Sequence, residues 1–200
     1  MPQLTVWLVR HGESTANAGL PSLTHADVLL TDRGREQAAH VARAVDRRPD
    51  LLVTSPFLRA RATAEPIAQR WPGVPQEVWP IEEFSYLSAE RCRGSTVEMR
   101  RPWVRDYWER ADPHAVDGPG AESFAQFMQR LQAFGDRLLR QSGFVVAVGH
   151  GQFFRAFLWG ESHGFEATPA RMADYRAAEV ARPMGNGEVI AWHPVGSRGT

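Results

Sequence analysis

The sequence predicts an α/β fold, a three-layer α/β/α sandwich with a mainly parallel sheet between two layers of helices. Short apolar runs alternate with longer stretches whose apolar residues recur every three or four positions, the pattern of strands alternating with helices. The runs 4–9, 51–53 and 144–148 are almost wholly apolar, as parallel strands buried on both faces are. We expect one domain over residues 1–200, because this length and a 43% hydrophobic composition suit a single globular core.

The first predicted strand ends in a cluster of reactive and polar residues. Arg10, His11 and Gly12 follow it directly, and Ser14 and Asn17 add short polar side chains on the next turn. An arginine fork suits phosphate, and a glycine lets the backbone approach a ligand closely. A neutral imidazole beside a phosphoryl group acts as a hydrogen-bonding clamp or as a nucleophile. This turn is therefore the first candidate for an anion site.

The second predicted strand leads into a helix that carries another arginine. Thr31, earlier in the chain, is expected to be the N-cap of the helix that precedes this strand. After the strand, the spacing predicts Ser55 as an N-cap and Pro56 as the first helical residue, with Arg59 in the first turn. Arg59 is thus expected near the same edge of the sheet as the first cluster.

The middle of the chain gives weaker signals. Prolines crowd residues 71–80, which we interpret as a connection with at most a short strand. In the arginine-rich segment 91–110, aromatic residues recur at helical spacing after Pro102 and predict an amphipathic helix. Residues 112–120 are rich in turn formers and predict a break.

The last third of the chain repeats the strand-and-cluster pattern. The expected order is a helix over 124–138, a strand over 144–148, a helix over 152–158 and an edge strand over 188–192. The strand ends in His150, which lies between Gly149 and Gly151. A third strand therefore ends in a candidate anion-binding residue.

In an open parallel sheet all carboxyl ends lie at one edge, so three strands and the turns after them converge there. The side chains brought together are Arg10, His11, Arg59 and His150. They form a pocket for a dianion, reinforced by the N-termini of neighbouring helices. Such a pocket needs no metal, and no group of carboxylates or histidines has convincing ligand spacing. We therefore predict no metal site and no cofactor.

Composition argues against several other classes of function. The formal net charge is zero, which gives no electrostatic case for binding nucleic acid or a membrane surface. All 23 cationic residues are arginines, which excludes mechanisms that depend on lysine. Cys92 is the only cysteine, and Arg91 and Arg93 beside it come without the histidine that a catalytic thiol uses. No basic-then-apolar leader or membrane-spanning run is present, so the expected location is the cytoplasm.

These residues resemble the signature of the histidine phosphatase superfamily, which has the phosphoglycerate-mutase-like fold. The matching motifs are the turn Arg10, His11, Gly12 with Ser14 and Asn17, the helix opening 55–63, and Gly149, His150, Gly151. Lesser matches lie in residues 30–38 and 120–123. A single short motif can match a family by chance, whereas several motifs in the right order over most of the chain are specific for that family.

The resemblance implies a metal-independent phosphomonoesterase that acts on a small phosphorylated metabolite. His11 would attack phosphorus and form a phosphohistidine, and the flanking arginines should keep it neutral for that purpose. The phosphoryl oxygens would be held by Arg10, Arg59 and His150. Further contacts to the substrate are implied for Asn17, Ser14 and Gly151.

The resemblance also implies a glutamate as general acid and base, soon after the second helix. Glu83 fits that position, and the adjacent Glu82 is the alternative. Residues 84–120 would form a lid or insert over the site. Four arginines of this segment could contact a second anionic group of the substrate: Arg91, Arg93, Arg100 and Arg101. The simpler interpretation is that they form a solvated charged face.

The motifs also bear on the branch of the family. Ser14 and the pair His150, Gly151 differ from the acid-phosphatase and phytase pattern, and the short segment between the glutamate and His150 favours a phosphatase over a mutase. Two alternatives remain, a cofactor-dependent phosphoglycerate mutase-type phosphotransferase and a non-catalytic phospho-ligand-binding regulatory module. The aromatic content permits a homodimer. The other histidines are interpreted as structural or solvent-facing: His25, His40, His114, His163 and His193.

Overall fold

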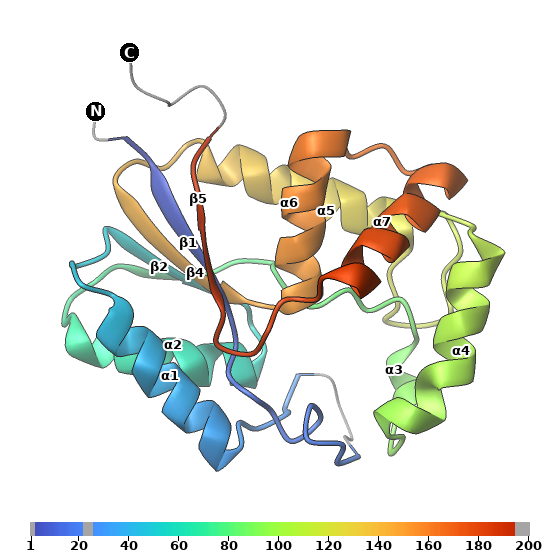
Figure 1. Cartoon of the computed structure of the whole chain (residues 1–200), viewed down its shortest axis with the longest axis horizontal. Helices are drawn as coiled ribbons and strands as arrows, with labels where there is room; N and C mark the ends of the chain where they lie inside the picture. The colour runs from blue at the N-terminus through green and yellow to red at the C-terminus, as the bar shows by residue number, and fades with distance from the viewer. Residues whose placement is uncertain (1–2, 22–25, 195–200) are drawn as a thin grey trace.

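The protein is described here by a computed structural model, which covers residues 3–21 and 26–194. A five-stranded sheet with the order β3-β2-β4-β1-β5 lies at its centre (Figure 1). The strands are β1 (Thr5–Arg10), β2 (Leu51–Thr54), β3 (Gln76–Val78), β4 (Phe144–Gly149) and β5 (Val189–Trp192). All pairings are parallel except that of β5 with β1, which is antiparallel. The predicted, mainly parallel α/β sheet is confirmed.

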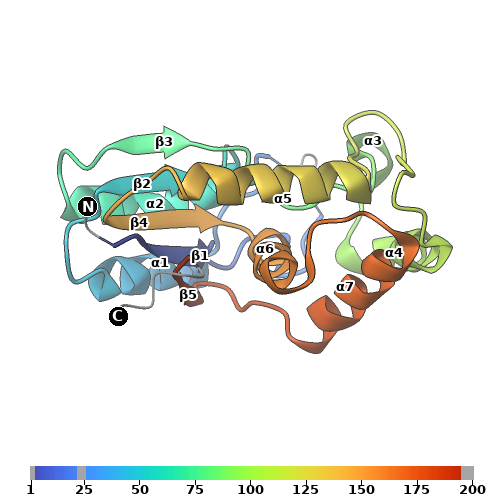
Figure 2. The ribbon, with the colours of Figure 1, turned by 90° about the horizontal axis from the view of Figure 1, so that it is seen from above.

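Helices cover both faces of the sheet. They are α1 (Asp32–Ala44), α2 (Leu58–Arg70), α3 (Ala89–Cys92), α4 (Val97–Arg110), α5 (Phe124–Leu138), α6 (Gly151–His163) and α7 (Pro169–Ala181). Helices α1 and α2 pack on one face and α5 and α6 on the other, which makes the three layers. Figures 1 and 2 both place α3, α4 and α7 to one side of the sheet. In the part of the chain that the structure describes, no helix has the length and apolar character needed to cross a membrane.

The strand β4 explains why the sequence pattern is apolar without alternation. Each of its six residues is buried. Val145 and Ala147 join the core under α5 and α6, whereas Val146 and Val148 join the core under α1 and α2. Successive side chains of a strand point to opposite faces, so a sheet covered on both faces needs apolar residues at every position.

Helix α2 begins later than the sequence predicts. Phe57 is its N-cap and Leu58 its first residue, so the predicted start at Ser55 and Pro56 is wrong. The Ser55 hydroxyl instead accepts a hydrogen bond from the Phe57 N–H at 3.2 Å and lies 2.8 Å from the Nε2 atom of His150. The helix therefore begins two residues later than predicted, at Leu58. Arg59 is nevertheless in the first turn, as predicted.

Two further helices differ from the sequence prediction. Helix α4 begins at Val97, with Thr96 as its N-cap, so Pro102 lies inside the helix and does not mark its start. Helix α7 is absent from the prediction because it buries only Met172 and Tyr175 and so lacks a clear apolar stripe.

The turn after β1 is packed against helix α1 through two glycines. A Cβ atom on Gly12 would lie 2.3 Å from the Gly34 carbonyl oxygen, and a Cβ atom on Gly34 would lie 2.0 Å from the Glu13 carbonyl oxygen. Real Cβ atoms do not come so close to backbone, so both positions require glycine. Gly12 therefore serves backbone packing against α1, and its close approach to a ligand stays a prediction.

Replacing Gly34 by alanine tests this contact. In an unobstructed helix the change stabilises by about 1 kcal/mol, because alanine is the better helix former. Here we expect the free energy of unfolding, measured by urea denaturation, to fall by about 1–3 kcal/mol. The control is Gly185→Ala, whose Cβ would meet Glu188 Oε2 at an ordinary 3.4 Å. A Gly34→Ala protein as stable as the parent would contradict this packing.

Candidate active site

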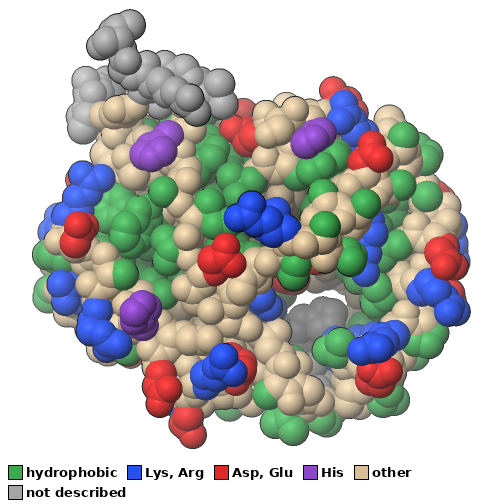
Figure 3. Space-filling model, viewed as in Figure 1, with side chains coloured by type: hydrophobic (Ala, Val, Ile, Leu, Met, Phe, Trp, Pro, Cys, Tyr) green, Lys and Arg blue, Asp and Glu red, His purple; other side chains and the backbone are tan. Residues whose placement is uncertain are grey.

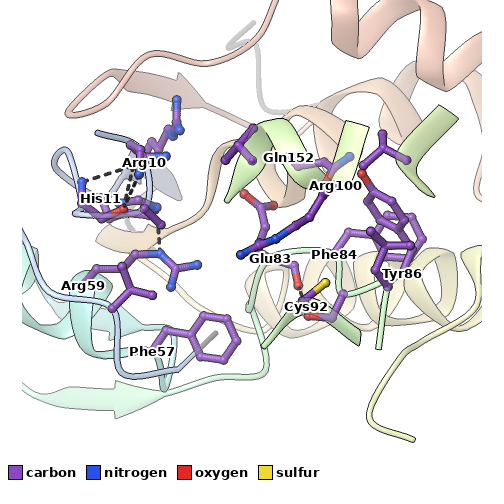
Figure 4. A pocket seen from close by; sticks show the side chains of 18 residues that line it. Arg10, His11, Phe57, Arg59, Glu83, Phe84, Tyr86, Cys92, Arg100 and Gln152 are labelled. Atoms are coloured by element: carbon purple, nitrogen blue, oxygen red, sulfur yellow. Dashed lines mark hydrogen bonds between the residues drawn. The ribbon is translucent and has the colours of Figure 1, made fainter. Parts of the chain in front are cut away.

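A cavity of about 290 Å³ lies at the carboxyl ends of β1, β2 and β4. The turn after β1 and the start of α2 form one wall, and residues 83–87 with α3 and α4 form the other (Figure 4). Figure 3 shows the molecule hollowed between α4 and the part that contains the sheet. The charged and nucleophilic side chains that line the cavity include Arg10, His11, Arg59, Glu83, Cys92 and Arg100.

His11 follows β1 directly and is 2% exposed. Its backbone N–H donates to the Gly149 carbonyl at the end of β4, at 2.9 Å. The ring atom Nδ1 lies 2.7 Å from the Gly12 carbonyl oxygen. Because a carbonyl only accepts, Nδ1 carries the proton and Nε2 has a free electron pair. Nε2 accepts a hydrogen bond from Arg59 Nε at 3.1 Å, and it is the ring atom able to act as a nucleophile.

Arg59 connects the two histidines. Its Nη2 atom donates to His150 Nδ1 at 3.2 Å, so His150 carries its proton on Nε2 and donates it to the Ser55 hydroxyl. His150 is fully buried, with its ring centroid 5.1 Å from that of His11 and 5.2 Å from that of Phe57. The structure brings the four predicted residues together, but His150 lies behind Arg59 and does not line the cavity.

Arg10 is held at one end only. Its Nη1 atom donates to the Met184 carbonyl, whereas its buried Nε atom has no hydrogen-bond partner among the described residues. A Cβ atom on Gly151 would lie 2.9 Å from Arg10 Cδ. Gly151 thus makes room for the arginine side chain and is not one of the residues lining the cavity.

Ser14 and Asn17 both line the cavity and are bonded to each other. The Asn17 Oδ1 atom accepts from the Ser14 hydroxyl at 2.9 Å, from the Ser14 N–H at 3.2 Å and from Asn186 Nδ2 at 3.1 Å. With its oxygen occupied by three donors, Asn17 has its Nδ2 group to offer to an anion. Ser14 orients Asn17 through these bonds.

The loop before β5 is a part of the site that the sequence prediction missed. Besides Met184, it supplies Asn186, whose Nδ2 also donates to the His11 carbonyl at 3.1 Å, and the N–H of Gly187, which donates to the Arg10 carbonyl at 3.1 Å. The Gly-Asn-Gly sequence of residues 185–187 is a turn signal, although nothing in it indicates contact with β1.

Of the two adjacent glutamates, Glu83 faces the cavity. It lies across the cavity from His11 and Arg59 (Figure 4), and its Oε1 atom accepts from the Phe153 N–H at 3.2 Å. Glu82 does not line the cavity, and its Oε2 atom lies 3.6 Å from Arg130 Nη1. The geometry therefore favours Glu83 over Glu82 as the group that can exchange a proton with a ligand.

Burial and positive charge keep both histidines neutral. Burial, followed by the effect of Arg59, lowers the pKa of His11 to about 3, although the hydrogen bond to Gly12 partly opposes this. Burial and then Arg59 and His11 lower the pKa of His150 well below its usual range. The predicted neutrality of His11 thus holds in direction, with burial as a larger cause than the arginines.

Burial acts in the opposite direction on Glu83. It raises the pKa of the carboxyl group, against the lowering effects of Arg10 and then Arg59. Burial also lowers the pKa of Arg59 to about 10, which leaves the guanidinium protonated at neutral pH. A carboxyl with a raised pKa beside a neutral imidazole is suited to donating a proton while the imidazole donates electrons.

The arginines of the segment 84–120 have different surroundings. Arg100 lines the cavity, so its interpretation as part of a solvated face is wrong. Arg91 pairs with Asp117 at 2.5 Å and Arg101 pairs with Glu98 at 2.8 Å, while Arg93 is exposed. One arginine of the four therefore faces the site.

The remaining candidates lack the surroundings for chemistry. Burial raises the pKa of the Cys92 thiol, the reverse of what a thiolate nucleophile requires. The described histidines outside the cluster are exposed, as predicted: His40, His114, His163 and His193. His25 lies outside the described residues. Over residues 3–21 and 26–194, no group of three or more metal-ligating side chains is found.

Comparison with known proteins gives one family. The model of the histidine phosphatase superfamily, branch 1, matches residues 6–182. An adenosylcobalamin/alpha-ribazole phosphatase of Salmonella typhimurium is 34% identical over 145 residues, which cover 66% of this chain and 69% of that protein. A 2,3-bisphosphoglycerate-dependent phosphoglycerate mutase of Mycobacterium leprae is 30% identical over 186 residues, which cover 77% of this chain and 75% of the mutase.

Solved structures agree on the fold. The alpha-ribazole phosphatase from Shigella flexneri matches with a TM-score of 0.71 and 24% identity, covering 94% of this chain and 89% of that one. The layers, sheet and helix placement described above are therefore shared with phosphatases of this fold.

The protonation state of His11 can be measured directly. A histidine in the unfolded chain titrates near pH 6.5, whereas folded His11 stays neutral until about pH 3, so stability is lost as pH falls through this interval. We expect ¹⁵N NMR of the His11 ring to report the Nδ1–H tautomer, unchanged from pH 7 to pH 5. The urea-unfolded protein is the control, and a titration of folded His11 within that range would contradict the assignment.

Proposed function

The chain belongs to the histidine phosphatase superfamily and is a phosphatase, and we propose that it hydrolyses small phosphomonoesters through a phosphohistidine at His11, without a metal ion. The observation that carries the proposal is the unprotonated Nε2 atom of His11, with Arg10 and Arg59 on the same cavity wall. Its electron pair accepts from Arg59 Nε and can attack phosphorus once that hydrogen bond is released. The two guanidinium groups supply the positive charge that a phosphate dianion needs.

In the first step, His11 Nε2 attacks phosphorus and the bond from phosphorus to the ester oxygen breaks. Arg10 and Arg59 stabilise the charge on the phosphoryl oxygens, with the Asn17 amide as a further donor. Glu83 acts as the general acid and gives a proton to the departing oxygen; burial raises the pKa of its carboxyl group and so favours the protonated form. The products are an alcohol, phospho-His11 and the Glu83 carboxylate.

In the second step, water attacks the phosphohistidine. The Glu83 carboxylate takes a proton from the water, the bond from nitrogen to phosphorus breaks, and inorganic phosphate leaves. His11 regains its electron pair and Glu83 its proton, so the enzyme returns to its starting state.

His150 supports this reaction through Arg59. It accepts from Arg59 Nη2 and is itself held by Ser55, which fixes the guanidinium beside His11. A direct bond from His150 to a phosphoryl oxygen requires Arg59 to give up its hydrogen bond to His150 Nδ1. We therefore assign His150 an orienting role as well as the phosphate contact that the family resemblance implies.

The substrate fits between the two walls. With the phosphate at His11, the leaving group extends toward residues 84–104, which supports the proposal that the segment 84–120 is a lid within a single domain. A small phosphorylated metabolite suits a cavity of about 290 Å³. We place the enzyme in the cytoplasm, where a lone, buried thiol such as Cys92 is in keeping with the reducing conditions.

Hydrolysis of p-nitrophenyl phosphate in the presence of EDTA tests this function. We expect His11→Ala to lower kcat by more than about 10³-fold, because the nucleophile is lost. His163→Ala is the matched control, since this histidine is exposed and stacks on Trp159. The wild type should also hydrolyse other small phosphomonoesters.

Three results would contradict the proposal. Loss of activity in EDTA would contradict metal independence. Isomerisation of phosphoglycerate that depends on a bisphosphoglycerate primer, without hydrolysis, would instead identify a mutase-type phosphotransferase. Binding of phosphate without turnover of any small phosphomonoester would identify a regulatory binding module.

A further inference from the structure

Glu83 lies in a segment that forms neither helix nor strand, between β3 and α3. A general acid has to come within about 2.6–3.2 Å of the oxygen that it protonates. A misplacement of about 1 Å can cost on the order of 10²-fold in rate. The segment's own backbone has no regular ladder to provide such precision, so other groups must hold it.

Arg130, on α5, contacts this segment directly. Its Nη1 atom donates to the Glu82 carbonyl at 2.9 Å and to the Pro80 carbonyl at 3.2 Å. These carbonyls lie on both sides of Ile81, and Glu82 directly precedes Glu83. One guanidinium thus fixes the backbone immediately before the acid.

Glu122 completes the support from the other side. Its carboxylate accepts from Arg130 through two atoms, Nε at 3.1 Å and Nη2. It also accepts from the Ser85 N–H at 3.3 Å, while its own N–H donates to the Ser85 carbonyl at 3.0 Å. The backbone on both sides of Glu83 is therefore bonded to the Arg130–Glu122 pair, which is 17% and 20% exposed. Such a bidentate pair holds a defined geometry.

The same guanidinium packs against two aromatic rings. Its Cζ atom lies 5.3 Å from the ring centroid of Phe127 and 5.0 Å from that of Phe153. Phe153 is also the residue whose N–H donates to Glu83. Arg130 is therefore anchored to the end of α6 that binds the acid's carboxyl group.

Arg130 also contacts the other glutamate. Its Nη1 atom lies 3.6 Å from Glu82 Oε2, and Glu82 does not line the cavity whereas Glu83 does. We propose that Arg130, held by its hydrogen bonds to Glu122, is a positioning residue that sets the position and orientation of the Glu83 carboxyl group relative to His11. The proposal rests on the proposed function, since it assigns Arg130 an effect on proton transfer.

The test compares two leaving groups in the full-length enzyme. Nitrophenolate leaves readily without protonation, whereas the alkoxide of glycerol 2-phosphate needs a proton from Glu83. For Arg130→Met we expect kcat/KM to fall on the order of 10²-fold for glycerol 2-phosphate and less than about 3-fold for p-nitrophenyl phosphate. Glu83→Gln should show the same selectivity, and Glu82→Gln should not.

Arg137→Met is the matched control. Arg137 is on the same helix, packs over the Trp79 ring at 4.1 Å and pairs with Glu77 at 2.7 Å, but it has no hydrogen bond to residues 80–85. This variant loses comparable packing and charge while leaving the segment intact. We expect equal, small changes with both substrates.

A double mutant separates positioning from general damage. If Arg130 acts through Glu83, adding Arg130→Met to Glu83→Gln should lower kcat/KM for glycerol 2-phosphate no further. An additive loss, or an equal loss with both substrates in Arg130→Met, would overturn the proposal. If Arg130→Met does not fold, Glu122→Gln takes its place, with the same selectivity expected and the same outcomes contradicting it. A wild type that hydrolyses neither substrate would instead overturn the proposed function together with this inference.

Discussion

The position of one proton on His11 determines what the rest of the site can do. The Gly12 carbonyl holds that proton on Nδ1 and so leaves Nε2 unprotonated, with an electron pair that accepts from Arg59 Nε. Gly12 is itself fixed, because its N–H donates to the Thr63 hydroxyl at 3.0 Å and its Cα packs against Gly34. The same hydroxyl donates to the Arg59 carbonyl at 2.7 Å. Strand β1 and helices α1 and α2 thus combine to orient one ring.

The electrostatics of the cavity follow from that neutral ring. A protonated His11 would add a third cation beside the half-buried Arg10 and the buried Arg59, and burial and the two guanidiniums lower its pKa accordingly. The same two guanidinium groups that disfavour a charged imidazole also attract a phosphate dianion. Their positive charge therefore promotes substrate binding and also keeps the nucleophile neutral. The same burial raises the pKa of Glu83 and so favours the protonated form that a general acid needs.

Much of this arrangement can be predicted from the sequence, because strand ends and helix starts are local features. The apolar runs place His11 and Arg59 at one edge of a parallel sheet. What escapes prediction depends on long-range contacts: the Ser55 hydroxyl, expected only to cap a helix, also contacts His150, 95 residues away in the chain, and α2 starts at Leu58. Adjacent glutamates in an irregular segment carry no periodicity, so only long-range contacts distinguish them: Glu83 accepts from the Phe153 N–H, whereas the Glu82 carboxylate lies near Arg130. Asn186 is missed for the same reason.

The most direct test of the central claim is to trap the phosphoenzyme and locate the phosphoryl group. Rapid quenching of turnover with ³²P-labelled substrate, followed by digestion and chromatography of the phosphoamino acid, reports both the residue and the ring atom. The structure predicts an acid-labile phosphohistidine at His11, with phosphorus on Nε2, because Nδ1 is bonded to Gly12. Label on Nδ1, on another residue, or on no residue while hydrolysis continues would contradict the account.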